Sequence, residues 1–197
     1  MKGRKGRADV WFEAKRQGVH AAGSTYALVA YFLGSQAALI AACAVIAAAF
    51  FLGFMRSRRI GPFGGYLEGV MHDWITGFER PDEVPLGGLV TFSLGVVVVS
   101  ALFPAGIVVP AIIVLAAGDS VSTVIGKVWG DNPLFYNRKK SWEGSGAFFF
   151  VALAVLLFFV NPMKAVAIAA LVSVVEGMPG IDDNITVPLA TALLLSI

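Results

Sequence analysis

The sequence predicts an all-α, polytopic membrane protein with about seven transmembrane helices. Of its 197 residues, 57% are hydrophobic and only 14% are charged, and the mean hydropathy is +0.78. Soluble globular domains have roughly a quarter of their residues charged. Because a transmembrane helix needs about 20 apolar residues, a chain of this length can cross a bilayer about six or seven times if its loops are short. We therefore expect one integral membrane domain over residues 1–197.

Seven apolar stretches carry this prediction. Each is long enough for a helix rather than a strand, and membrane helices tolerate the prolines within them when neighbouring helices satisfy the freed backbone groups. The first two stretches are so close together that they must form a hairpin. The last is short, and whether it crosses fully is left open. The stretches are residues 19–34, 36–55, 84–102, 104–126, 144–160, 163–178 and 184–197.

Lysine and arginine residues predict the orientation. They collect in the N-terminal segment, in the 56–83 loop and in the 127–140 loop, and only Lys164 lies in a connection of the other set. Short cytoplasmic loops carry an excess of Lys and Arg. With seven spans, the three basic segments fall on one side of the membrane. We therefore expect a cytoplasmic N-terminus and a cytoplasmic site, in a plasma or internal membrane.

The sharpest motif lies near the end of the fourth apolar stretch and contains Asp119. A carboxylate at membrane depth costs about 3 kcal/mol or more unless it is paired, hydrated or bound to metal, so we interpret Asp119 as functional. Small residues surround it at every fourth position: Gly118, Ser122, Gly126 and Gly130. Such a stripe favours close helix packing, although a phosphate chain could also approach it.

A second motif precedes the fifth apolar stretch and combines cations, hydroxyls and a carboxylate. Lys140 and Ser141 suit phosphate oxygens, and Glu143 could hold Mg²⁺ or pair with Lys140. The alternative is a basic anchor beside membrane lipid head groups, with Ser141 as a helix cap. For Arg138 and Lys139 we prefer that alternative.

A third motif lies between the last two stretches and contains Glu176, Asp182, Asp183 and Asn184. One of the aspartates is sufficient to cap the last helix, which is the simpler interpretation. Two adjacent carboxylates with an amide and a further glutamate exceed what one cap requires. They match the oxygen ligands that Mg²⁺ prefers.

Other familiar motifs are missing from the sequence. It has no Gly-x4-Gly-Lys-Ser/Thr phosphate loop, no His-Glu-x-x-His and no Gly-x-Ser-x-Gly, and nothing in it favours a nucleic-acid partner. Two His and one Cys cannot furnish a nitrogen or sulfur zinc site without carboxylates. Oxygen ligands and cations around phosphate remain as the predicted chemistry.

Five short motifs occur in order along nearly the whole chain. They are Glu13-x-x-Arg16 with His20; Arg80-x-x-Glu83 with Gly88; Gly118-Asp119-Ser120 with Gly126 and Gly130; Lys140-Ser-x-Glu143-Gly-Ser145; and Glu176 with Asp182-Asp-Asn184 and Pro188. Their order resembles the CTP-dependent lipid kinases, which include dolichol kinase, phytol kinase and the CTP-using diacylglycerol kinase. These enzymes are related to phosphatidate cytidylyltransferases.

The resemblance implies an enzyme that transfers the γ-phosphate of CTP to a polyprenol, isoprenoid or diacylglycerol-like alcohol, with Mg²⁺ as cofactor and a lipid phosphate and CDP as products. The family usually has Arg-Lys before the histidine, where this chain has Arg16 and Gln17. The resemblance also implies roles for individual residues. The catalytic set is Asp119, Lys140, Glu143 and His20; the nucleotide-binding set is Arg16, Arg80, Gly118, Ser120, Gly126, Lys140 and Ser141; and the metal ligands are Asp119, Glu143, Asp183 and Asn184.

Two other functions stay open from the sequence. A phosphatidate cytidylyltransferase would use the same nucleotide but make a CDP-lipid. A small transporter or scaffold would use buried charges along an ion path, but here the charges gather at one face and no internal repeat is present. The acceptor alcohol and the oligomeric state are not specified by the sequence.

Overall fold

The fold is all-helical in the part of the chain that the structure describes, which confirms the predicted class. The computed structural model describes residues 18, 22–58, 69, 86–180 and 182–197. Helices occupy the predicted apolar stretches, with ends that differ by a few residues. They are α2 (Thr25–Leu33), α3 (Ser35–Arg58), α5 (Gly87–Leu102), α6 (Ala105–Trp129), α7 (Trp142–Leu156), α8 (Pro162–Glu176) and α9 (Asp183–Ser196).

The first two described helices form the predicted hairpin. Gly34 lies between α2 and α3 with φ +90, and its N–H bonds to the carbonyl of Ala30. This left-handed backbone explains the glycine, because a Cβ disfavours that conformation. The first stretch is shorter than expected, since a turn at residues 23–24 precedes α2. With 9 residues, α2 is only about 14 Å long.

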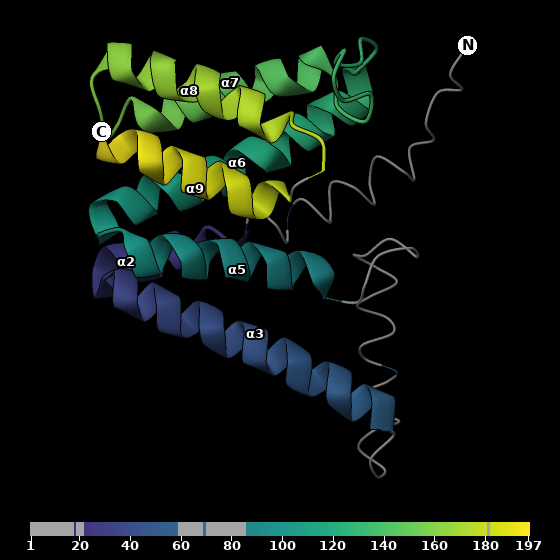
Figure 1. The fold of residues 1–197 in the computed structure, drawn as a ribbon, viewed down its shortest axis with the longest axis vertical. Helices are drawn as coiled ribbons and strands as arrows, with labels where there is room; N and C mark the ends of the chain where they lie inside the picture. The colour runs from purple at the N-terminus through teal and green to yellow at the C-terminus, as the bar shows by residue number, and fades with distance from the viewer. Residues whose placement is uncertain (1–17, 19–21, 59–68, 70–85, 181) are drawn as a thin grey trace.

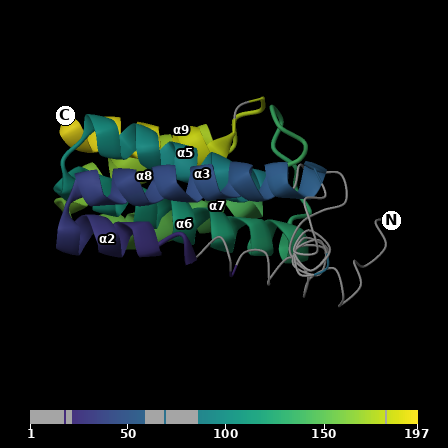
Figure 2. The ribbon, with the colours of Figure 1, turned by 90° about the horizontal axis from the view of Figure 1, so that it is seen from below.

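The helices lie side by side as a bundle in which successive elements run in opposite directions (Figure 1). Helix α6 is central and contacts α2, α5, α7 and α9, while α3 packs on α5 and α8 packs on α7 and α9. The α2–α3, α5–α6 and α7–α8 turns and the C-terminus share one end of the bundle. Residues 130–141 and 177–180 lie together at the opposite end, which we call the site end (Figures 1 and 2).

Small side chains bring the helices close together. Buried alanines lie on α2, α3, α6, α7, α8 and α9, and larger buried residues such as Ile112, Leu115 and Phe148 fill the centre. Small residues at helix contacts allow close backbone approach, as in membrane proteins. The outer face carries large apolar side chains, among them Phe150 on α7, which is 69% exposed. An apolar outer face suits lipid better than water.

Two helices of the described chain are long and apolar enough to cross a membrane. They are Ser35–Met55 and Ala105–Trp129, with 21 and 25 residues. Helices α5 and α7 are apolar but shorter. The all-helical prediction is therefore confirmed, whereas the seven-span arrangement stays a prediction.

Gly95 lies at a close contact between α5 and α9, and it provides a test of the packing. A Cβ at this position would overlap the backbone oxygen of Asn184 and approach Pro188. Because backbone cannot move aside as a flexible side chain can, Gly95→Ala should destabilise the fold by about 1–3 kcal/mol. Gly88→Ala is the matched control on the same helix, where a Cβ meets nothing within 4 Å. Equal melting temperatures of the two variants in detergent would contradict this packing.

Candidate active site

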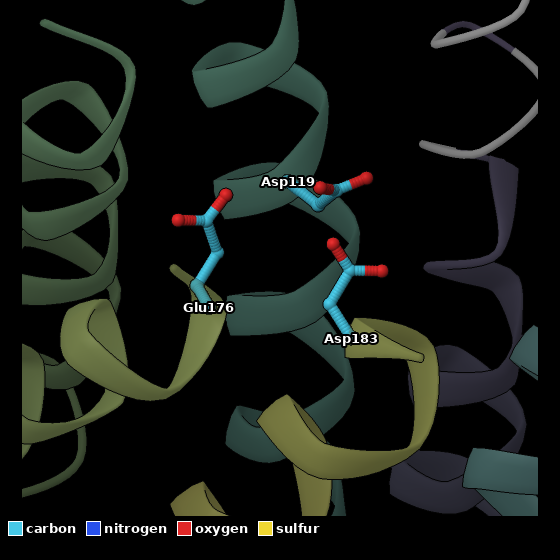
Figure 3. A group of neighbouring side chains, drawn as sticks. All are labelled: Asp119, Glu176 and Asp183. Carbon is cyan, nitrogen blue, oxygen red and sulfur yellow. The ribbon is translucent and has the colours of Figure 1, made fainter. Parts of the chain in front are cut away.

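Three carboxylates from three helices converge near the site end of the bundle. Asp119 comes from α6, Glu176 is the last residue of α8 and Asp183 is the first residue of α9. One oxygen from each lies within 4.8 Å of the others, and the three side chains lie in the same region between their helices (Figure 3). We call these three residues the carboxylate cluster.

The side chain of Lys140 enters this cluster. Its Nζ lies 2.5 Å from Glu176 Oε1, 2.9 Å from Asp183 Oδ2 and 3.9 Å from Asp119 Oδ1. Burial alone would lower the pKa of Lys140, but the nearby charges of Asp183, Glu176 and Asp119 outweigh it and hold the pKa above its ordinary value. The ammonium is therefore charged at neutral pH, and it balances part of the negative charge of the cluster.

The backbone that carries Lys140 is held on both sides. Leu134 is fully buried within the 130–141 loop, and its N–H bonds to the carbonyl of Lys140 at 3.0 Å. Asn137 accepts the N–H of Lys140 and donates through Nδ2 to the carbonyl of Gly177 at 3.0 Å. These bonds tie the loop to the α8–α9 turn, so Lys140 faces the carboxylates on both sides of that turn.

Glu176 is the most enclosed member of the cluster, with only 1% of its side chain exposed. Its Oε1 accepts from Ser122 Oγ at 3.2 Å, and its Oε2 accepts from Ser145 Oγ at 3.4 Å. Buried charge is tolerated only when it is paired and hydrogen-bonded. Glu176 belongs to the third sequence motif, whose oxygen groups suit Mg²⁺, but it is not among the four metal ligands that the resemblance implies. Its position at the very end of an apolar helix is the sequence feature that singles it out.

The small-residue stripe on α6 packs against α7. A Cβ on Gly118 would lie 2.7 Å from the ring of Phe148, and a Cβ on Gly126 would lie 3.2 Å from Ser141 Oγ and 3.6 Å from the Cα of Gly144. Helix α7 thus fills the space above both glycines, which agrees with the packing interpretation. The nucleotide-binding roles of Gly118 and Gly126 stay predictions that this geometry does not favour.

Ser141 is the N-cap of α7, since its Oγ accepts from the N–H of Gly144 at 3.2 Å. This is the capping alternative that the sequence allowed, and it uses the hydroxyl that was expected to orient phosphate. Ser120, with the same expected role, donates to the carbonyl of Ala116 at 2.6 Å. Both hydroxyls thus make local hydrogen bonds to the backbone of their own chain segment.

Glu143 lies apart from the carboxylate cluster. Its Oε1 accepts from Asn132 Nδ2 at 2.6 Å, and its carboxylate also receives the Asn132 backbone N–H. The side chain thus closes the base of the 130–141 loop. The structure does not bring Glu143 together with the other predicted metal ligands.

The three polar residues at the start of α9 make different contacts. Asp182 caps the helix by accepting the Asn184 N–H at 3.0 Å, which leaves Asp183 to enter the cluster. The Nδ2 of Asn184 donates to Thr91 on α5 at 3.0 Å. Its buried Oδ1 has no hydrogen-bond partner among the described residues. Asn184 thus joins α9 to α5, while the predicted ligand role of its oxygen is untested.

Arg16, His20 and Arg80 lie outside the described residues. Their predicted contacts with nucleotide and acceptor alcohol therefore stay predictions. Among the predicted residues that are described, the structure brings together Asp119, Lys140 and Asp183 and adds Glu176 to them.

The site has the composition of a phosphate-handling centre. Three carboxylate groups offer oxygen ligands to a divalent cation, and a charged lysine beside them can contact phosphate oxygens. Asp183 and Lys140 are each 28% exposed, so the cluster is partly open on one side in the described part of the chain.

The chain is similar in sequence to proteins that are named as kinases of phytol or farnesol. The chain is 29% identical to "Probable phytol kinase, chloroplastic" of Zea mays over 164 residues, which are 72% of this chain and 54% of the relative. It is 30% identical to "Phytol kinase 1, chloroplastic" of Arabidopsis thaliana over 142 residues, or 60% of this chain and 45% of the relative. "Farnesol kinase, chloroplastic" of Arabidopsis thaliana is 30% identical over 96 residues, or 40% of this chain and 31% of the relative.

The chain spans about half the length of the phytol kinases that it matches. No protein-family model and no solved structure matches it. The relatives nevertheless agree with one another in their names, and they agree with the resemblance carried by the sequence motifs. The comparisons therefore support the lipid kinase family that the sequence motifs resemble, which includes the phytol and farnesol kinases.

Proposed function

We propose that this protein is a membrane-embedded kinase that transfers the γ-phosphate of CTP to an isoprenoid alcohol, giving a prenyl phosphate and CDP. The observation that carries the proposal is the convergence of Asp119, Glu176 and Asp183 around Lys140. The names of the relatives support an isoprenoid acceptor. CTP as donor rests on the resemblance of the sequence motifs.

The carboxylate cluster fits Mg²⁺, because its three oxygens come from different helices and lie within 4.8 Å of one another. Mg²⁺ usually takes one or two carboxylates together with waters and substrate phosphates. Asp119, Glu176 and Asp183 would hold it, and when bound it would neutralise phosphate charge. We therefore expect excess chelator to abolish turnover, measured as label transferred from CTP to lipid. Unchanged turnover in chelator would remove the metal role from all three carboxylates.

The proposed reaction depends mainly on positioning the alcohol beside the γ-phosphate and on stabilising the negative charge of the phosphates. The oxygen of the alcohol forms a bond to the γ-phosphorus while the bond from that phosphorus to the β-phosphate oxygen breaks, and CDP leaves. Phosphoryl transfer of this kind depends on cations near the phosphates more than on covalent catalysis. Lys140 supplies a cation from the protein. We assign Asp119 as the general base that accepts the proton of the alcohol; its side chain belongs to the cluster and is 11% exposed.

The membrane arrangement is part of the proposal. Helices α7, α8 and α9 have 14 or 15 residues and are about 21–23 Å long. A hydrocarbon core of about 30 Å needs flanking residues or local thinning for each to cross. Trp129 and Trp142 are exposed at the facing ends of α6 and α7. Tryptophan favours the membrane–water interface, which supports placing the site end at the bilayer surface.

Orientation can be tested by cysteine labelling in intact cells, in a Cys43→Ala background that removes the one native cysteine. Lys139→Cys at the site end should be protected from an impermeant reagent, because basic loops stay cytoplasmic. Met163→Cys, at the opposite end and 85% exposed, should be labelled. The reverse pattern would contradict a cytoplasmic site.

The activity itself is tested with purified protein, a panel of phytol, farnesol, geranylgeraniol, dolichol and diacylglycerol, and CTP or ATP with Mg²⁺. Label from γ-phosphate should enter the lipid when CTP and an isoprenoid alcohol are supplied. Label from the α-phosphate of CTP in the lipid would instead identify a cytidylyltransferase. ATP serving better than CTP would correct the proposed donor.

A further inference from the structure

The ammonium of Lys140 lies where a divalent cation bound by the cluster would lie. Its Nζ is 2.5 to 3.9 Å from one oxygen of each of the three carboxylates. Those residues offer oxygens within 4.8 Å of one another. Mg²⁺ binds its oxygen ligands at about 2.1 Å. An ion bound to these oxygens of two carboxylates would therefore overlap the ammonium or be repelled by its charge at close range. The two cations thus cannot bind the same oxygens of the cluster together.

We propose that Lys140 is an internal counter-ion that prevents free divalent cations from binding to the cluster. When a nucleotide arrives, the ammonium moves from the carboxylates to the phosphates. This inference rests on the proposed function, because it takes a nucleoside triphosphate as the ligand that draws Lys140 away. Metal and nucleotide then bind as one coupled event. Phosphate oxygens replace the carboxylates as partners of the ammonium, and the divalent cation replaces the ammonium as partner of the carboxylates.

The side chain of Lys140 can move out of the carboxylate cluster. Its side chain is 28% exposed, and a lysine has a flexible stem of four carbons. Glu176 is 1% exposed and is held by the hydroxyls of Ser122 and Ser145. The backbone at Lys140 is itself fixed through Leu134 and Asn137. A change of side-chain rotamer therefore suffices, without rearrangement of the helices or the loop.

The charge balance gives the exchange its direction. In the nucleotide-free cluster, a divalent cation must displace an ammonium that is already paired with Glu176 and Asp183. The displaced ammonium then has no anionic partner from the nucleotide. When the nucleotide is present, both cations have anionic oxygens to bind. Lys140 thus makes cation binding weak alone and strong together with the nucleotide.

The test measures binding of Mn²⁺, as a paramagnetic substitute for Mg²⁺, by electron paramagnetic resonance without nucleotide. The wild-type protein, Lys140→Met and the control Lys139→Met are compared in the same detergent. Lys139 is the adjacent, exposed lysine outside the cluster. Lys140→Met should bind Mn²⁺ more tightly than the wild type, by a factor within the usual range of about 5- to 150-fold for coupled sites. Lys139→Met should match the wild type.

Equal or weaker Mn²⁺ binding by folded Lys140→Met would overturn the counter-ion role. If Lys140→Met does not fold, two other variants are compared: the single variant Glu176→Gln and the double variant Glu176→Gln with Lys140→Met. The double variant loses one carboxylate charge together with the cation. Loss of the lysine should again tighten Mn²⁺ binding, and no tightening would overturn the inference. Kinase assays on the wild type test the proposed function separately. Phosphate transfer to an alcohol, without tighter Mn²⁺ binding on loss of Lys140, refutes only the counter-ion role. The Mn²⁺ effect without transfer to any alcohol refutes the proposed function.

Discussion

Asp119→Asn should reduce the rate of phosphate transfer about 100-fold or more while the protein still folds and inserts. The substitution keeps the size of the side chain and removes the charge that would hold a metal or accept a proton. Lys140 lies 3.9 Å from Asp119 but 2.5 and 2.9 Å from the other two carboxylates, so it keeps its nearest partners. Turnover is measured with labelled CTP and stability by a thermal melt in detergent.

Asp131→Asn is the matched control for this experiment. Asp131 is exposed in the loop that follows α6 and is not a member of the cluster. Its variant should keep the wild-type rate. Near wild-type turnover in well-folded Asp119→Asn would remove the catalytic assignment. A loss of about 3 kcal/mol in stability would instead make Asp119 a structural partner of a buried cation.

Glu176→Ala should give the largest loss of stability at the site, about 3–5 kcal/mol. The change removes the buried partner of Lys140 and the acceptor of the Ser145 hydroxyl, and it leaves the Ser122 hydroxyl with only the Asp119 carbonyl as acceptor. Buried donors that lose an acceptor keep the cost of their desolvation. Thermal or denaturant unfolding of the detergent-solubilised protein measures the effect, and phosphate transfer should fall as well.

Asp183→Ala is the comparison that isolates burial. It also removes a carboxylate that bonds to Lys140, but Asp183 is 28% exposed, so water can take its place. Its loss of stability should be clearly smaller than that of Glu176→Ala, since exposed ion pairs contribute little. Equal losses for the two variants would show that enclosure of Glu176 is not what makes it stabilising.

The sequence by itself determined the helical class and the approximate limits of the described helices. Apolar runs of helix length leave the backbone little choice, because every N–H and C=O in an apolar environment needs a partner within the chain. The hairpin at Gly34 followed from the spacing of the first two runs and the single glycine. Asp119, Lys140 and Asp183 could also be singled out, because charges beside apolar helices are expensive and hence informative.

Only the tertiary structure decided which of the polar residues meet. Glu176 joins Asp119 across α6 and α8, while Glu143 turns to Asn132 and Ser141 to its own helix cap. Residue spacing predicts which face of one helix a side chain occupies, but not which face of a distant helix lies opposite. Which faces meet follows from packing. The glycines of α6 allow α7 to approach closely, and the 130–141 loop places Lys140 beside the carboxylates. Contacts between residues far apart in the chain depend on how whole helices fit together, and a single sequence does not encode that fit in any local pattern.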